Sequence, residues 1–105
     1  MSPREQERLR QAEAWLREHF PVRGEVRVRY NWPDAKDHGA CEEDGDGGYI
    51  ISIHEGSPFK IDTLLHEWAH LGKRQMNHGK LWGRRYQLIV QKWFDQGGAE
   101  ASRNF

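Results

Sequence analysis

A chain of 105 residues has room for one small domain, and its single cysteine excludes a disulfide framework and a zinc ribbon built on four cysteines. Its formal net charge of zero argues against strong nonspecific binding to nucleic acids. The charge is uneven, however: residues 31–67 hold two lysines against nine acidic residues, and residues 68–105 hold seven basic against two acidic residues. The sequence begins without an apolar signal segment and no stretch approaches a membrane span, so we expect a soluble cytoplasmic protein, a monomer without a membrane partner.

The first half of the chain predicts one helix and then three short strands. Ser2 is a favourable N-cap and Pro3 suits the first helical position, so we predict a helix over residues 2–20. Residues 25–32 alternate apolar and polar side chains, which predicts a half-buried strand. Residues 39–54 predict a hairpin, with a short strand near residues 40–42 and a stronger strand over residues 49–54. The predicted buried stripe of the helix consists of Leu9, Ala12, Leu16 and Phe20.

The second half predicts two further helices. One runs from Ser57, as its cap, to Gly72, which can end it, and the other runs from about His78 to Phe94. This order of elements predicts an α+β fold, with helices packed on a small, mostly antiparallel three-stranded sheet. We expect one domain over residues 1–105, in which residues 96–105 form a loose tail. The predicted buried stripe of the last helix consists of Trp82, Tyr86, Ile89 and Trp93.

The helix predicted after Ser57 carries an HExxH motif formed by His66, Glu67 and His70. Residues four positions apart lie about 40° apart around a helix, so both imidazoles can reach one ion at the usual zinc–nitrogen distance of about 2.0–2.1 Å. Glu67 is turned away by one position and can instead reach a water molecule on the metal, which is the place of a general base. A surface helix that is rich in histidine is the alternative. Apolar neighbours favour a packed helix, in which an unused carboxylate would be costly to bury.

A catalytic zinc ion needs a third protein ligand and one open coordination position. His78 is the leading candidate, because it follows His70 by eight residues and the loop between them holds no competing ligand. Glu100, the only glutamate downstream of the motif, lies in the expected tail. The reserve candidates for the third ligand are Cys41, His38 and His54.

The segment IDTLLHEWAHLGKRQMNHGKLWGRRY, residues 61–86, resembles the metal-binding segment of SprT-like zinc metallopeptidases and related small HExxH zincins of bacteria and phages. In that family a hydrophobic helix carries the motif, and a later histidine, often followed by glycine and then by an aromatic residue, completes the site. The resemblance extends over about residues 39–94 and does not include the C-terminal zinc ribbon that many members carry. The positions that match the family pattern are His66, Glu67, His70, His78, Gly79 and Trp82.

The resemblance implies a zincin-like fold and a zinc-dependent endopeptidase that acts on a protein or peptide. One Zn²⁺ ion would be bound by His66, His70 and His78, with Glu67 as the general base. In zincins an edge strand upstream of the metal helix aligns the substrate, and the strand of Tyr49, Ile51 and Ile53 is the candidate here. The candidates for a second oxyanion donor are Tyr86, His54 and Arg85.

Two alternative functions would use the same zinc-binding residues in a different way. A catalytically silent, zinc-stabilised binding module would need the ligands but not Glu67, so the presence of Glu67 argues against it. A nucleic-acid-associated protease would place the basic C-terminal third on DNA and act on DNA-bound proteins, an idea that the zero net charge weakens.

Overall fold

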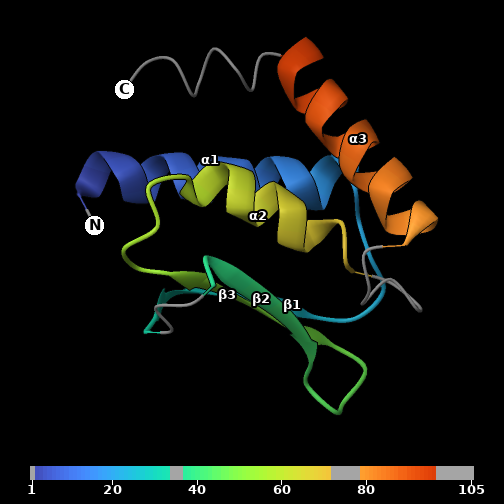
Figure 1. The fold of residues 1–105 in the computed structure, drawn as a ribbon, viewed down its shortest axis with the longest axis horizontal. Coiled ribbons are helices and arrows are strands. Elements are labelled where there is room, and N and C mark those ends of the chain that lie inside the picture. The colour runs from blue at the N-terminus through green and yellow to red at the C-terminus, as the bar shows by residue number, and fades with distance from the viewer. Residues whose placement is uncertain (1, 34–36, 72–78, 97–105) are drawn as a thin grey trace.

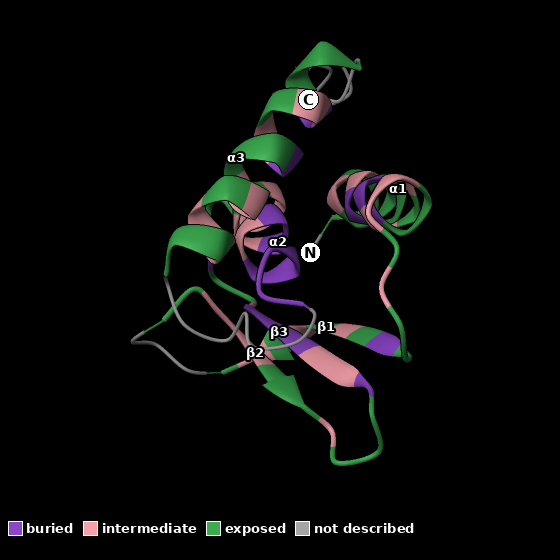
Figure 2. Cartoon of the chain, turned by 90° about the vertical axis from the view of Figure 1, so that its right-hand side faces the viewer, coloured by how far each residue is buried: buried purple, intermediate pink, exposed green. Residues whose placement is uncertain are grey.

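The computed structural model describes residues 2–33, 37–71 and 79–96 (Figure 1). The elements in these ranges are α1 (Pro3–His19), β1 (Val26–Trp32), β2 (Gly39–Glu43), β3 (Tyr49–His54), α2 (Lys60–Trp68) and α3 (Lys80–Asp95). This order confirms the predicted α+β class. The helices lie on one side of the sheet, and buried residues line the inner sides of α2 and the sheet (Figure 2).

The first helix and its buried stripe follow the sequence prediction closely. The Glu5 amide donates to the Ser2 hydroxyl at 3.1 Å, which supplies the N-terminal cap. Leu9, Ala12 and Leu16 are buried in the core. None of the described helices combines the length and the apolar character that crossing a membrane requires.

The sheet has the order β1-β3-β2, so β3 is the central strand. It runs antiparallel to β2, as the predicted hairpin requires, and parallel to β1. The prediction of a mostly antiparallel sheet is therefore wrong, because the direction of the β1–β3 pair is not encoded in either strand's own alternation. The three central residues of β3 are buried, in line with its nearly continuous apolar run.

The central position of β3 also corrects the expected substrate strand. Tyr49, Ile51 and Ile53 belong to a strand whose two edges already pair with β1 and β2. Added-strand binding needs free backbone amides and carbonyls along one edge, and β3 has neither edge available. Among the described strands, the open edges belong to β1 and β2.

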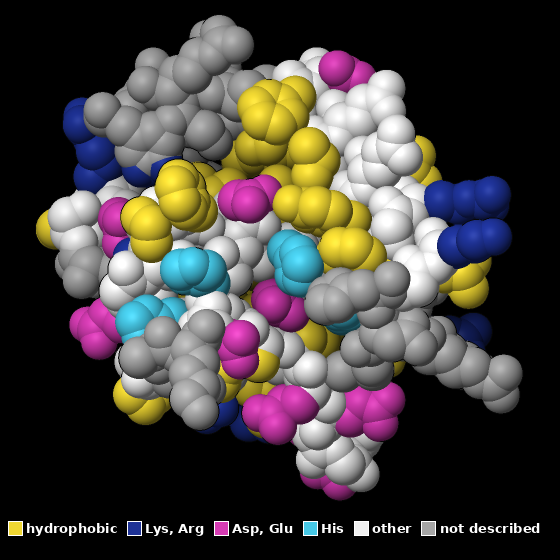
Figure 3. Space-filling model, viewed as in Figure 1, with side chains coloured by type: hydrophobic (Ala, Val, Ile, Leu, Met, Phe, Trp, Pro, Cys, Tyr) yellow, Lys and Arg dark blue, Asp and Glu magenta, His cyan; other side chains and the backbone are white. Residues whose placement is uncertain are grey.

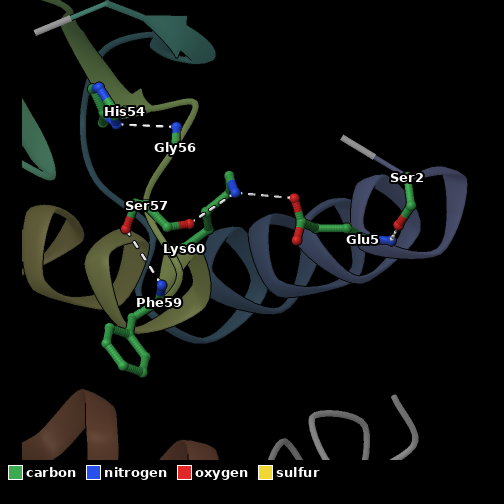
Figure 4. Close-up of polar contacts among 7 residues, drawn as sticks. All are labelled: Ser2, Glu5, His54, Gly56, Ser57, Phe59 and Lys60. Atoms are coloured by element: carbon green, nitrogen blue, oxygen red, sulfur yellow. Dashed lines mark hydrogen bonds and ion pairs between the residues drawn. The ribbon is translucent and has the colours of Figure 1, made fainter. Parts of the chain in front are cut away.

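The second helix begins at Lys60 and ends at Trp68, so it is shorter than the predicted helix, which starts directly after its cap Ser57 and ends at Gly72. Ser57 is buried, and its hydroxyl accepts the Phe59 amide hydrogen at 3.3 Å in the turn that precedes the helix (Figure 4). The Lys60 ammonium donates to the Ser57 carbonyl at 2.8 Å and lies 3.1 Å from the Glu5 carboxylate. This short turn therefore ties the start of α2 to the first turn of α1.

The last helix begins at Lys80 and ends at Asp95, near the predicted limits of His78 and Phe94. Residue 78 and the predicted tail from residue 97 onward lie outside the described residues. Trp93 of α3 meets Trp15 of α1 edge-on at 5.0 Å between ring centroids, which joins the two helices through the core.

Candidate metal centre

The end of α2 and the turn that follows it bring the three residues of the HExxH motif together. The ligand atoms of His66, Glu67 and His70 all lie within 4.8 Å of one another. Two ligands of one tetrahedral zinc ion lie about 3.4 Å apart, so the two imidazoles need only small rotations to share an ion. Within the described residues, this is the group of histidine, cysteine and acidic side chains that could hold a metal.

Local backbone structure explains how the pair is presented. The Ala69 amide donates to the Leu65 carbonyl in the α-helical pattern, whereas the His70 amide donates to the Glu67 carbonyl at 3.0 Å. The chain therefore tightens into a 3₁₀-type turn directly after α2. Trp68, which is 1% exposed, holds this end of the helix in the core, and its indole N–H donates to the Phe20 carbonyl at 2.9 Å.

Trp82 of α3 packs on both histidines. Its ring stacks on His70 with centroids 5.3 Å apart and meets the edge of the His66 ring at 4.8 Å. Its indole N–H donates to the His66 carbonyl at 3.4 Å. Trp82 thus has the expected packing role, because it joins the start of α3 to the end of α2.

Tyr86 extends this aromatic layer by one helical turn. Its ring stacks on Trp82 at 5.3 Å and lies 5.4 Å from His66. Its hydroxyl donates to Asp62 Oδ1 at 2.8 Å, and Asp62 lies one turn before His66 on α2. Burial, followed by the interaction with Asp62, raises the pKa of Tyr86 to about 12, so the phenol remains a hydrogen-bond donor at neutral pH.

An open cleft of about 540 Å³ is lined by residues of α2, of β2 and of the segment that precedes β2. Histidine and acidic side chains gather on this face of the molecule, beside the hydrophobic side chains that cover the helices (Figure 3). The lining residues are Asp37, His38, Gly39, Ala40, Cys41, Asp62, Thr63, His66, Glu67 and His70.

Gly39 sets the distance between β2 and α2. A Cβ atom at this position would lie 2.6 Å from the Thr63 methyl carbon and 3.3 Å from Glu67 Cγ. Both distances are shorter than an ordinary contact, so a larger residue would push Thr63 or Glu67 away. The absence of a side chain at position 39 therefore helps to define where Glu67 sits.

Glu67 is the unusual group of the site. It is only 6% exposed, and its carboxylate has no hydrogen bond or ion pair within the described part of the chain. Burial raises its pKa to about 7, and the Asp37 carboxylate adds to the increase. A carboxyl group with a pKa near the working pH is suited to take up and release a proton.

The expected third ligand, His78, lies outside the described residues, so its position relative to His66 and His70 is not described. Two of the reserve candidates, His38 and Cys41, line the cleft but are not part of the close group. Burial, followed by the charge of Glu67, raises the pKa of the Cys41 thiol to about 12, which disfavours a thiolate there.

The three candidates for the oxyanion donor separate in space. Tyr86 contacts the cleft residues His66 and Asp62, as described above, but is not itself among the cleft-lining residues. His54 is not among the cleft residues, and its Nδ1 accepts the Gly56 amide hydrogen at 3.0 Å (Figure 4). Arg85 is also outside the described cleft lining, and burial lowers the pKa of its guanidinium.

Residues that the sequence analysis did not select also form the site. Asp62 precedes His66 by four positions, so helical periodicity alone places it on the same face and could have identified it. Gly39 and Asp37 come from a distant part of the chain, and no local pattern connects them with the motif.

Comparison of this chain with protein-family models, with curated proteins and with solved structures finds no match. The chemistry of the site is therefore inferred from its own residues.

Proposed function

We propose that the chain is a zinc-dependent metalloendopeptidase of the SprT-like class of HExxH zincins, acting in the cytoplasm on protein or peptide substrates. The observation that carries this proposal is the buried Glu67 carboxylate, which has no partner among the described residues and lies between two histidines that face an open cleft. Burying a carboxylate in such surroundings lowers the stability of the fold, and groups of this kind are concentrated at functional sites.

The side chains at the end of α2 suit a zinc ion in both type and spacing. Imidazole nitrogen is a common zinc ligand, and His66 and His70 offer two such nitrogens within reach of one ion. His78 is proposed as the third ligand, on the residue pattern that resembles the family. A structural zinc site is closed by four protein ligands, whereas an open cleft beside the pair favours a catalytic site with one free position.

Zinc, when bound, supplies a Lewis acid for the substrate carbonyl and for the attacking water. With zinc in place, Glu67 would take the proton from that water and deliver it to the amine that leaves. Tyr86 is the proposed second donor to the developing oxyanion, because its ring lies 5.4 Å from the His66 ring and its hydroxyl stays protonated at neutral pH. Its hydrogen bond to Asp62 would have to open or be shared for this role.

The proposed substrate strand is β2. Its residues Gly39, Ala40 and Cys41 line the cleft, and one of its edges pairs with β3. The opposite edge has no partner strand in the described sheet. A peptide added along that edge would pass directly in front of Glu67.

The test is cleavage of an unfolded protein by the zinc-loaded chain. Glu67→Gln should keep its zinc and lose cleavage, whereas the matched control Glu55→Gln should cleave like the wild type, because Glu55 is exposed and outside the cleft. Equal cleavage by wild type and Glu67→Gln would contradict the proposal. A wild type that holds zinc and cleaves no unfolded protein would instead indicate the silent binding module.

A further inference from the structure

We infer that an apolar groove over the start of α2 binds an apolar segment of the same unfolded polypeptide that is cleaved in the metal cleft. This inference rests on the proposed function. It names what the substrate must carry beside the scissile bond, which is an aromatic or aliphatic side chain about three residues away.

The apolar groove has a volume of about 430 Å³ and is lined by residues from the N-terminal half of α1, the start of α2 and the C-terminal half of α3. Three buried residues of the core, Leu9, Leu65 and Trp93, belong to this lining. Phe59 and Phe94 also line the groove, yet these two side chains are 67% and 60% exposed. Large exposed apolar side chains around a concave surface are typical of binding sites.

The backbone of Phe59 is held in place although its ring is exposed. Its amide donates to the Ser57 hydroxyl at 3.3 Å, and its carbonyl accepts the Thr63 amide hydrogen at 2.9 Å in the first turn of α2. The same turn is tied to α1 through Lys60 and Glu5. Figure 4 shows the Phe59 ring pointing away from these contacts. A ring on a fixed backbone loses little freedom when it binds a partner, so Phe59 is suited to contact a substrate.

The charged side chains of the groove balance one another. Lys60 lies 3.1 Å from Glu5, and Asp62 accepts the Tyr86 hydroxyl at 2.8 Å. Together with Arg8, the described lining holds two basic and two acidic residues, so it has no net charge that would select an ionic ligand. The lining therefore favours an apolar side chain, and unfolded proteins expose such side chains whereas folded proteins bury most of them.

The groove meets the metal cleft at Asp62, which lines both of them. On this face of the molecule, hydrophobic side chains gather next to the histidines (Figure 3). Lys60, the first residue of α2, precedes His66 by six positions, which is about 9 Å along the helix axis. An extended peptide advances by about 3.3 Å per residue, so a chain with its scissile bond at His66 reaches the groove about three residues from that bond. One polypeptide can therefore occupy both sites.

The experiment compares quenched fluorescent peptides that differ only by Phe or Ser at one position, scanned through the residues on each side of the scissile bond. At the preferred position we expect wild-type kcat/KM to be about tenfold higher for the Phe peptide than for the Ser peptide. Phe59→Ser and Phe94→Ser should each remove most of this preference, and thermal unfolding should show that both variants fold, because both side chains are exposed. Leu88→Ser is the matched control: it removes a 60% exposed side chain of α3 outside the groove lining and should leave the preference unchanged.

Binding separates this inference from the proposed function. The zinc-loaded, non-cleaving Glu67→Gln variant should bind the Phe peptide about tenfold more tightly than the Ser peptide, as measured by fluorescence anisotropy, and adding Phe59→Ser should remove the difference. Equal binding and equal cleavage of the two peptides would overturn the inference while leaving a Glu67-dependent protease intact. A Phe preference in binding that depends on Phe59, together with no cleavage by wild type, would support the groove and overturn the protease.

Two further outcomes would assign the groove differently. A Phe preference that survives both Phe59→Ser and Phe94→Ser would overturn the role of the groove. Dimers of the wild type in analytical ultracentrifugation that Phe94→Ser dissociates, together with equal binding of the two peptides, would assign the groove to a second copy of the chain and overturn the inference.

Discussion

Replacing Glu67 by Gln should stabilise the metal-free protein at neutral and alkaline pH, although the same change should abolish cleavage. The carboxyl group has a pKa of about 7 in the folded chain, mainly because of burial, against an ordinary value of 4.5. At about 1.36 kcal/mol per pH unit, ionising it in the folded state costs about 3 kcal/mol more than in the unfolded state. Water in the open cleft reduces this penalty, so we expect Gln to gain about 2 kcal/mol.

The sign of the pH dependence follows from proton binding. Between pH values of about 4.5 and 7 the folded state holds more protons on Glu67 than the unfolded state, so Glu67 makes wild-type stability fall as the pH rises through this window. Gln has no proton to lose. The advantage of Glu67→Gln should therefore be small below a pH of about 4.5, grow through the window, and reach its full size above pH 7.

Urea unfolding of the metal-free wild type and Glu67→Gln, across that pH range, measures the effect directly. His66 and His70 are present in both proteins, so their own titration largely cancels in the difference. Glu55→Gln, with an exposed side chain, should show no pH-dependent gain. Two proteins of equal stability at every pH, or a wild type that is more stable at high pH, would refute the idea that burial raises the pKa of Glu67.

Three further substitutions test the packing around the site. Gly39→Val should lower the rate of cleavage and the free energy of unfolding, the latter by about 2 kcal/mol, because the valine side chain would collide with α2 beside Glu67. A cleavage assay and thermal unfolding measure the two effects. A variant with unaltered activity and stability would contradict the close approach of β2 to α2. Trp82→Ala should weaken zinc binding by about tenfold or more, as measured by chelator competition, because His70 loses its stacking partner; unchanged affinity would exclude a role for the indole. Trp68→Phe keeps a buried ring but removes the hydrogen bond to the end of α1, so the free energy of unfolding in urea should fall by about 1–3 kcal/mol. An unchanged free energy of unfolding would show that this hydrogen bond contributes little.

Features that depend on neighbouring residues could be predicted from the sequence. The cap of α1 needs only Ser2 and the residues next to it, and the limits of β3 follow from its apolar run. The spacing of His66 and His70 likewise predicted that their ligand atoms lie close together, although His70 lies in the tight turn after α2 and not in the helix. These predictions succeed because helix and strand geometry converts short spacings into positions on one face.

Features that depend on distant pairing could not be predicted in the same way. The alternation of side chains along a strand does not specify which strand it pairs with. The sequence therefore did not predict the parallel pairing of β1 with β3 or the central position of β3 in the sheet. The helix α2 begins at Lys60, later than predicted, because the hydroxyl of Ser57 accepts a hydrogen bond within the turn that precedes the helix. The contribution of Gly39 to the cleft arises only when β2 lies against α2, and its own sequence surroundings give no sign of it.

The most direct measurement is the metal content of the folded, purified chain, determined by mass spectrometry and elemental analysis. We expect one zinc ion per chain in the wild type, a sharp loss of zinc in His78→Ala, and full occupancy in His54→Ala, since His54 lies outside the cleft lining of the described residues. A wild type without stoichiometric zinc would contradict the metal centre. Retention of zinc in His78→Ala together with its loss in His54→Ala would assign the third ligand to His54 instead.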